Sequence, residues 1–323
     1  MTASAKGLDA ATWAALVAQA AEVTERAAIA AHHLTGRGDE KAADQVAVDA
    51  MRTALNALDI QGRIVIGEGE RDEAPMLFIG EEVGTGKGPA IDIALDPLEG
   101  TTLTAKAMAN ALAVVAFAPR GGLLHAPDTY MNKIAIGPGY PAGTVDLDNS
   151  PEDNVRALAK AKGVSPEDVT VCVMDRPRHA ELIAALRSVG AKVLLITDGD
   201  VAGVIHTAEP ETGIDLYLGS GGAPEGVLAA AALKCVGGFF QGRLIFRNDD
   251  ERERARRTGV TDFERKYALD ELVSDQAIFV ATGVTKGAML DGVRVSGGQV
   301  STHTVVMDSA SKTVRRIHTV RPA

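Results

Sequence analysis

The chain has 323 residues, of which 46% are hydrophobic and 24% charged, and its formal net charge is −10. This length predicts a large core and two domains, and the composition is that of an ordinary soluble globular protein. The negative balance argues against nucleic acid as a partner, because that requires a basic surface.

The first part of the chain predicts helices followed by short strands. Alanine-rich sequence predicts a helix over 10–34, and a second helix follows over about 41–58. Alternating apolar and polar residues over 90–95 predict a strand with one buried face, and the apolar run 111–117 predicts a central strand. Shorter strands are expected at 64–66 and 133–136.

The segment 137–150 is rich in Gly, Pro, Asp and Asn, which is typical of a junction between domains. We therefore predict one domain over 1–145 and a second over 146–323. After the junction, helices and strands alternate, which favours parallel strand pairing in the second domain.

The elements predicted in this second part are listed in chain order. They are helices over 151–162, 178–189 and 224–235, strands over 169–174, 192–196 and 214–218, a loop over 219–223, and a hairpin of strands 299–307 and 312–320. The run 247–257 carries both charge signs and is expected to be a solvated helix face.

The two cysteines, Cys172 and Cys235, lie in separate apolar segments and indicate neither a disulfide framework nor a cysteine metal site. Residues 1–9 lack a signal-peptide pattern, and no apolar run is long enough to span a membrane. The expectation is a cytoplasmic protein with no membrane partner.

The most informative motif directly follows the strand 90–95 and runs from Asp96 to Thr102 with the sequence DPLEGTT. Two carboxylates three residues apart, Asp96 and Glu99, repel each other unless a cation lies between them. Carboxylate oxygens suit Mg²⁺ or Mn²⁺, and a hydroxyl one turn further on can orient a water. The motif therefore indicates a metal-dependent hydrolase of phosphate esters.

Three further carboxylates are ambiguous when each is considered alone. Glu68 lies at a strand end between two glycines, where it can project toward a ligand or simply face solvent. Asp44 fits a solvated helix position. Glu225 follows a glycine-rich stretch and is either a metal ligand or an acidic residue that complements the helix dipole.

Candidate cations for binding phosphate are Arg176, Arg178 and His179, between a strand and a helix. Lys133 and Lys286 are weaker candidates, because a lysine in such a sequence context is more often an ordinary surface residue. His32 and His33 have no partner at metal-ligand spacing and are expected to be surface or packing residues.

Six motifs taken together are far more specific than any one of them. In order they are GEGERDEAPML (67–77), DPLEGT (96–101), APDTYM (126–131), RPRH (176–179), DGD (198–200) and GGAPEG (221–226). This combination resembles the bacterial class II fructose-1,6-bisphosphatases, members of the lithium-sensitive, metal-dependent sugar phosphatase superfamily, over about residues 10–320.

The resemblance implies a layered αβαβα sandwich of two domains, a mixed α/β fold, with Mg²⁺ or Mn²⁺ as cofactor. It implies hydrolysis of the 1-phosphate of fructose 1,6-bisphosphate to fructose 6-phosphate, and also cleavage of sedoheptulose 1,7-bisphosphate as in photosynthetic relatives. A homo-oligomer, either a dimer or a tetramer, is expected, with a role in gluconeogenesis.

The resemblance also assigns the site residues position by position. The metal ligands are implied to be Asp44, Glu68, Asp96, Glu99 and Glu225, with Thr101, Asp96 and Glu68 as catalytic residues. The substrate-binding residues are implied to be Glu99, Gly100, Thr101, Tyr130, Arg176, Arg178, Asp198 and Asp200.

Two positions depart from the family pattern. Glu40 follows the early Gly-Asp pair where a lysine is usual, and Lys41 comes one residue later. Arg176 stands where many members carry lysine, and it would contact phosphate as a planar fork rather than a point charge.

Two alternative functions stay open. One is a related phosphatase that acts on inositol phosphates or phosphonucleotides, against which the class II motifs argue. The other is a catalytically silent binding protein on the same fold, against which the complete set of matched carboxylates argues.

Overall fold

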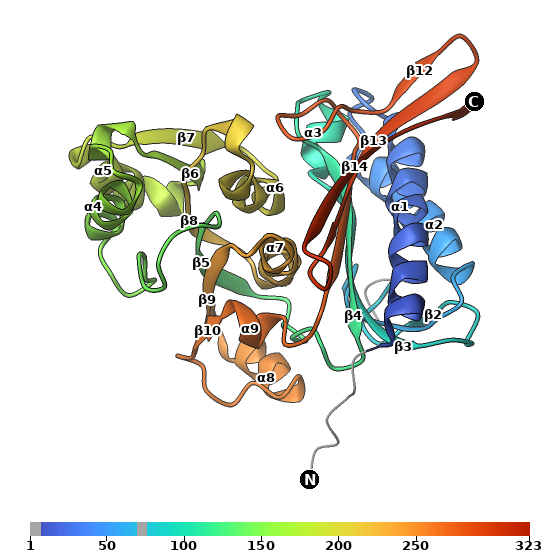
Figure 1. Ribbon diagram of the computed structural model, residues 1–323, viewed down its shortest axis with the longest axis horizontal. Coiled ribbons are helices and arrows are strands. Elements are labelled where there is room, and N and C mark those ends of the chain that lie inside the picture. Colours follow the sequence, from blue (N-terminus) through green and yellow to red (C-terminus); the bar gives the residue numbers. More distant parts are fainter. Residues whose placement is uncertain (1–7, 70–75) are drawn as a thin grey trace. The chain divides into compact units, whose positions relative to one another are not determined.

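The computed structural model describes residues 8–69 and 76–323, which form two compact units (Figure 1). Unit 1 combines the chain up to His125 with Val273–Ala323, and unit 2 is the continuous stretch Ala126–Leu272. Each unit is built on its own β-sheet with helices packed against it, which confirms the predicted mixed α/β class.

Unit 1 contains the early helices and an eight-stranded sheet. Its elements are α1 (Ala10–His32), α2 (Glu40–Asn56), β1 (Gln61–Ile66), β2 (Glu82–Val83), β3 (Ala90–Glu99), α3 (Thr101–Ala105), β4 (Leu112–Pro119), β11 (Ile278–Gly283), β12 (Arg294–Ser296), β13 (Gln299–Asp308) and β14 (Thr313–Pro322). The strand order is β12-β13-β11-β4-β3-β1-β2, with β14 paired to β13. The central position predicted for the strand at 111–117 is therefore confirmed.

Helices α1 and α2 pack on one face of this sheet (Figure 1). Asp9 caps α1 by accepting hydrogen bonds from the backbone N–H groups of Ala11 and Thr12, which would otherwise be unpaired. Five of the eleven buried residues of α1 are alanines, and larger side chains such as Trp13 and Leu16 lie among them. The indole N–H of Trp13 donates to Asp308 over 2.8 Å and ties α1 to the end of β13.

The C-terminal strands return to unit 1, and the predicted boundary at residue 145 therefore differs from the observed division. β11 lies between β4 and β13 in the sheet and pairs antiparallel with both. The segment proposed as a junction lies inside unit 2, where the Asn154 and Gln241 side chains hydrogen-bond the backbone N–H groups of Asp146 and Leu147. Side-chain hydrogen bonds thus hold a Gly- and Pro-rich segment within a domain.

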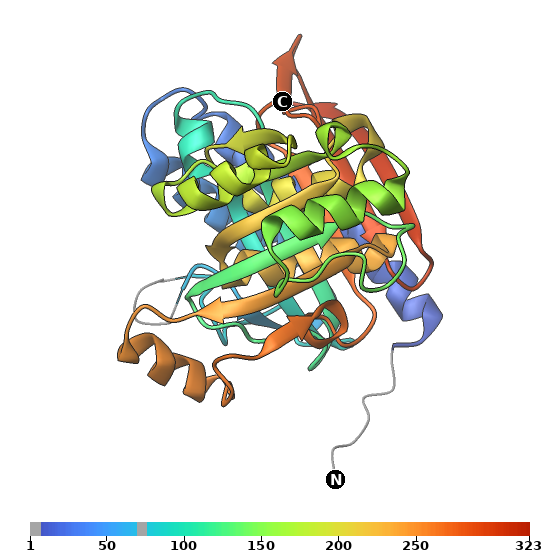
Figure 2. The ribbon, with the colours of Figure 1, turned by 90° about the vertical axis from the view of Figure 1, so that its left-hand side faces the viewer.

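Unit 2 is a three-layer arrangement around a six-stranded sheet with the order β10-β9-β5-β8-β6-β7. Its elements are β5 (Tyr130–Ile136), α4 (Pro151–Lys162), β6 (Thr170–Met174), α5 (Ala180–Ser188), β7 (Lys192–Ile196), α6 (Asp200–Ile205), β8 (Leu216–Gly222), α7 (Ala223–Val236), β9 (Phe239–Ile245), α8 (Asp249–Arg257), β10 (Lys266–Ala268) and α9 (Leu269–Leu272). Helices α4 and α5 cover one face and α6 and α7 the other (Figure 1), and Figure 2 shows α4 and α5 from the front. The layering of the two domains as an αβαβα sandwich stays a prediction.

The prediction of parallel pairing in the second domain holds for only part of the sheet. β6 runs parallel to β7 and β8, whereas β5 pairs antiparallel with β8 and β9, and β9 with β10. The alternating pattern that predicted parallel strands is confined to 151–218. The flanking strands β9 and β10 were not predicted, and they extend the sheet beyond that βαβ segment.

The glycine-rich stretch 219–222, predicted as a loop, is the end of strand β8. It pairs antiparallel with β5, so that Gly219 lies opposite Lys133 and Gly222 opposite Tyr130. A Cβ atom on Gly221 would lie 1.8 Å from Oδ2 of Asp200, so the strand passes too close to that carboxylate for any other residue. Here glycine marks a close approach rather than a turn.

The predicted late hairpin and the predicted charged helix are both present. The late hairpin is β13–β14, with Asp308 opposite Thr313. The charged run forms α8 and is mostly solvated, although Glu251 within it is buried. No helix in residues 8–69 and 76–323 is long and apolar enough to cross a membrane.

Candidate active site

The DPLEGT motif folds into a strand, a bulge and the start of a helix. Asp96 lies opposite Val114 and Glu99 opposite Leu112, so β3 carries one more residue than β4 between these pairs. The backbone N–H of Leu98 donates to the Asp96 carboxylate over 3.0 Å. The bulge accommodates Pro97, which has no N–H to offer the ladder.

Gly100 connects the strand to α3 with a φ of 90°, a conformation that side-chain-bearing residues rarely adopt. Glu99, immediately before it, is 5% exposed, and Thr101, immediately after it, is the first residue of α3. The two carboxylates and the Thr101 hydroxyl are therefore held on one short, rigid unit, as predicted from the sequence.

Glu68 is held at the end of β1 by a close backbone approach. A Cβ atom on Gly67 would lie 2.0 Å from the carbonyl oxygen of Leu77, so only glycine fits there. The backbone N–H of Glu68 then donates to the same carbonyl over 3.0 Å. The rest of the GEGERDEAPML motif, residues 70–75, lies outside the described residues.

In unit 1, the carboxyl group of Glu68 interacts electrostatically with those of Asp44 and Asp96. Burial, followed by the negative charges of Asp96 and Asp44, raises the pKa of the Glu68 carboxyl to about 9. Burial also raises the pKa of Asp44, which lies on α2. Helix α2, the end of β1 and the end of β3 thus contribute three carboxyl groups, and the charges of Asp96 and Asp44 disfavour ionisation of Glu68.

A divalent cation fits this group. Without one, Glu68 can lower its electrostatic cost only by keeping its proton, whereas a hard cation would favour all three carboxylates in the charged form. Among residues 8–69 and 76–323, no group of three Asp, Glu, His or Cys side chains is placed so that it could hold a metal ion as it stands. Carboxylate oxygens are donors that suit Mg²⁺ and Mn²⁺, and binding of either ion by these three residues stays a prediction.

Binding of Mn²⁺ should release a proton from Glu68. The metal-free carboxyl keeps its proton up to about pH 9, but it must ionise to become a ligand, so Mn²⁺ affinity should rise by up to about tenfold per pH unit below that value. Between the reference pKa of 4.5 and about 9, Glu68 is ionised in the unfolded chain but protonated in the folded, metal-free protein. The free energy of unfolding of the metal-free protein should therefore fall as the pH rises through this range. Calorimetric titration in two buffers of different ionisation enthalpy would measure the proton release.

The matched variant is Glu68→Gln, which should bind Mn²⁺ more weakly and without proton release, while the exposed Glu82→Gln on β2 should behave as the wild type. Equal proton release from the wild type and from Glu68→Gln would show that another group titrates.

In unit 2, two arginines lie against the ring of Tyr130. The guanidinium carbons of Arg178 and Arg247 each lie 4.9 Å from the centre of its ring. Arg247 is held by Glu251, whose Oε1 accepts from Nε over 2.6 Å and whose Oε2 accepts from the Arg247 backbone N–H over 2.7 Å. Burial opposes ionisation of Glu251, but the hydrogen bonds from Arg247 and Thr129 hold its pKa below the usual range.

Ser220 holds the guanidinium of Arg178 in place, and His179 in turn holds Ser220. Its Nε donates to Ser220 Oγ over 2.9 Å and its Nη2 to the Ser220 carbonyl over 2.7 Å. The Ser220 backbone N–H donates to His179 Nε2 over 2.9 Å, so the His179 proton is on Nδ1 and is donated to the Met174 carbonyl over 2.7 Å. Burial lowers the pKa of His179, which keeps the ring neutral in this bridge.

Asp200, predicted to contact substrate, is buried and paired with Lys133. The Lys133 Nζ lies 2.5 Å from Asp200 Oδ2, and both side chains are almost inaccessible to solvent. Lys133 is therefore not the surface lysine that its sequence context suggested. The pair lies under Gly221, at the same end of β8 as Ser220.

The other predicted residues of unit 2 lie around the same strand ends. Arg176 and Asp198 follow β6 and β7, whose carboxyl ends are neighbours in the sheet. Glu225 is in the first turn of α7, and its carboxylate folds back over Gly222. The structure thus groups Asp44, Glu68, Asp96 and Glu99 in unit 1, whereas Glu225 belongs to unit 2, and convergence of all five carboxylates stays a prediction.

Sequence reasoning missed Arg247, Glu251 and Ser220 as parts of this arrangement. Arg247 and Glu251 are four residues apart, a spacing that indicates an ion pair at a helix start, but nothing in the sequence places them beside Tyr130. Ser220 was hidden in a glycine-rich stretch interpreted as a loop.

Comparison with known proteins gives the family of the chain. Residues 14–321 match the family described as bacterial fructose-1,6-bisphosphatase, glpX-encoded. The chain belongs to this family.

Its curated relatives match over nearly their whole length. A D-fructose 1,6-bisphosphatase class 2/sedoheptulose 1,7-bisphosphatase from Synechococcus sp. (strain JA-3-3Ab) is 46% identical over 324 residues, covering 93% of each chain. Fructose-1,6-bisphosphatase 1 class 2 from Escherichia coli (strain K12) is 45% identical over 318 residues, covering 94% of each.

Among solved structures, inositol monophosphatase from Anabaena (Nostoc) sp. PCC 7120 aligns with a TM-score of 0.31 and 12% identity, over 60% of this chain and 71% of that one. That likeness is too weak to add to the family assignment.

Proposed function

We propose that this protein hydrolyses the 1-phosphate of fructose 1,6-bisphosphate and releases fructose 6-phosphate and phosphate. The observation that carries the proposal is the family match over residues 14–321, together with the half-buried carboxyl groups of Asp44, Glu68 and Asp96. Relatives whose names include sedoheptulose 1,7-bisphosphatase support that sugar as a second substrate.

Mg²⁺ or Mn²⁺ is the proposed cofactor. Asp44, Glu68 and Asp96 would hold it, and Glu99 and Glu225 are proposed to complete the set. When bound, the ion supplies positive charge for the phosphate oxygens and lowers the pKa of the attacking water. The raised pKa of Glu68 supports the assignment, because no positive group among residues 8–69 and 76–323 offsets the burial and the neighbouring negative charges that raise it.

The protein's own residues would orient the reactants. Thr101 is fixed at the start of α3 by the bend at Gly100. Its hydroxyl oxygen is proposed to accept a hydrogen bond from the attacking water and so to hold that water in line with the phosphorus atom. Glu99 and the Gly100 backbone lie beside it and are proposed to contact the same phosphate. Positioning and electrostatics therefore account for the catalysis, with no covalent intermediate on the protein.

The phosphate that is not cleaved is proposed to bind Arg176 and Arg178, with the sugar near Tyr130, Asp198 and Asp200. The bonds from Arg178 to Ser220 use two of the five N–H donors of its guanidinium, so the side chain is oriented and still has donors for phosphate. An arginine that is already ordered loses less entropy on binding the ligand.

Phosphate release from fructose 1,6-bisphosphate, sedoheptulose 1,7-bisphosphate and inositol 1-phosphate, measured with Mn²⁺ and with excess chelator, tests the proposal. We expect rapid release from the first substrate, slower release from the second, and little from the third or in chelator. Faster release from inositol 1-phosphate, or full activity in chelator, would contradict it.

Arg178→Ala should raise KM for fructose 1,6-bisphosphate by about tenfold or more and change kcat much less, because a charged hydrogen bond to the spectator phosphate stabilises substrate and transition state alike. Steady-state kinetics would measure the split, with the exposed Arg187→Ala at the end of α5 as a charge-matched control. A variant with normal KM and low kcat would assign Arg178 to the reacting phosphate instead.

We further propose that the activity serves gluconeogenesis in the cytoplasm and that the protein forms a dimer or tetramer. Family membership supports the metabolic role, and sedimentation equilibrium would test the assembly.

A further inference from the structure

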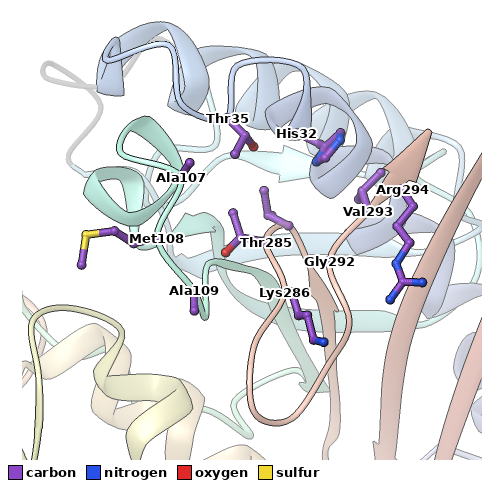
Figure 3. Close-up of a pocket in the computed structure, with 11 residues that line it drawn as sticks. His32, Thr35, Ala107, Met108, Ala109, Thr285, Lys286, Gly292, Val293 and Arg294 are labelled. Carbon is purple, nitrogen blue, oxygen red and sulfur yellow. The ribbon is translucent and has the colours of Figure 1, made fainter. Parts of the chain in front are cut away.

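Unit 1 contains a pocket of about 310 Å³ that shares no lining residue with the candidate active site (Figure 3). Its walls come from four segments that are distant in sequence, within 32–35, 107–109, 284–286 and 292–294. The volume is at the lower end of the range for small-molecule sites, about 300–1,000 Å³, so the pocket suits a compact ligand.

The pocket is preformed by hydrogen bonds between its walls. The backbone N–H of Ala111 donates to Thr285 Oγ1 over 3.0 Å, and that of Ala288 donates to Asn110 Oδ1 over 2.8 Å. These bonds fix the segment after α3 against the loop after β11. Ala107 and Asn110 adopt left-handed φ values of 53° and 76°, which this fixed geometry sustains.

The charged groups of the pocket are cationic. Lys286 and Arg294 line it, and no lining residue is acidic. Arg294 makes one exposed ion pair, with Asp291 at 3.4 Å, which is weak at such a distance and exposure. No salt bridge involves Lys286 in the part of the chain that the structure describes. Figure 3 shows His32, Lys286 and Arg294 on one side of the pocket and the small or apolar side chains at 107–109 on the other.

Two polar atoms of the lining residues are buried without a hydrogen-bond partner among residues 8–69 and 76–323: His32 Nδ1 and Thr35 Oγ1. Such atoms are uncommon in folded proteins, because each leaves a desolvated group unpaired. Burial lowers the pKa of His32, and a hydrogen bond to the Val284 backbone offsets this only partly. The neutral ring therefore presents Nδ1 as an acceptor, which a hydroxyl group would satisfy.

We propose that this pocket binds a small, hydroxyl-bearing phosphate monoester. Lys286 and Arg294 would bind the phosphate, as charge-assisted donors on a site free of acidic lining residues. His32 Nδ1 would accept a hydrogen bond from a ligand hydroxyl and Thr35 Oγ1 would bond a second one. Ala107, Met108 and Ala109 would cover the carbon chain.

The test is calorimetric titration of the full-length protein with glycerol 3-phosphate, and in parallel with glycerol and with inorganic phosphate. We expect saturable binding of glycerol 3-phosphate and at least roughly tenfold weaker binding of the other two, since each lacks one half of the recognised chemistry. Lys286→Ala and Arg294→Ala should each weaken glycerol 3-phosphate binding by roughly tenfold, the scale of one charged hydrogen bond.

Two further variants distinguish the pocket from other cationic sites. Lys87→Ala removes an exposed lysine from another turn of unit 1 and should bind glycerol 3-phosphate as the wild type does. Arg178→Ala weakens phosphate binding at the proposed substrate site, so saturable binding that persists in this variant and is lost in Lys286→Ala belongs to the pocket. Loss of binding in Arg178→Ala but not in Lys286→Ala would place the ligand in the substrate site and overturn the proposal. So would the absence of saturable binding, or binding of glycerol as tight as that of its phosphate. Equal affinity for inorganic phosphate would refute recognition of the hydroxylated chain.

Discussion

Asp96→Asn should reduce phosphate release from fructose 1,6-bisphosphate by on the order of a thousandfold, corresponding to about 4 kcal/mol of transition-state stabilisation. The substitution removes one charge from the group of Asp44, Glu68 and Asp96 but keeps nearly the same shape. Metal affinity should fall together with the rate. Calorimetric Mn²⁺ titration and steady-state kinetics on the same preparation would measure both.

The Asn variant should also lower the pKa of Glu68, because Asp96 has the larger effect of the two charges that raise it. Asp49→Asn, an exposed change on the same helix as Asp44, is a suitable control for the loss of one negative charge. Normal Mn²⁺ affinity in Asp96→Asn would mean that Asp96 is not a ligand, and the metal assignment would have to be rebuilt around other carboxylates.

Thr101→Ala should lower kcat by roughly a hundredfold or more, the scale of losing one positioned catalytic group, with KM and Mn²⁺ affinity near those of the wild type. Only a hydroxyl is lost, so the carboxylates keep their charge and their places on β3. Comparison of Thr101→Ala with Asp96→Asn therefore distinguishes the residue that binds the metal from the residue that orients the water.

Thr102→Ala is the matched control for Thr101→Ala, since it removes the neighbouring hydroxyl from the same turn of α3. Thr101→Ser, which keeps a hydroxyl, should recover much of the rate. If Thr101→Ala turned over at nearly the wild-type rate, Thr101 would be only a helix-terminus residue, and another group would orient the water.

The parts of the site that sequence could predict are those encoded in one continuous segment. Asp96, Glu99 and Thr101 lie within six residues, so strand alternation, a Pro and a Gly were sufficient to place them at a strand end. The late hairpin was predicted for the same reason, because its two strands are adjacent in sequence and pair residue by residue.

What sequence could not predict depends on contacts between distant segments. Tyr130 is far from both Arg178 and Arg247 along the chain, and only the pairing of β5 with β8 and β9 explains how the three meet. The burial of Lys133 beside Asp200 has the same origin. The glycines 219–222 were misinterpreted because a local rule associates glycine with turns, whereas here glycine makes room for the Asp200 carboxylate.

The return of the C-terminal strands to unit 1 has a consequence for synthesis on the ribosome. Strand β4 ends at Pro119, but its neighbour β11 begins only at Ile278. The sheet of unit 1 therefore cannot be completed until nearly the whole polypeptide has emerged from the ribosome. Unit 2 is continuous and can acquire all its strand partners earlier. A nascent chain released after Leu272 would carry an unpaired edge on β4 and an uncovered face of α1, which are surfaces that chaperones and proteases recognise.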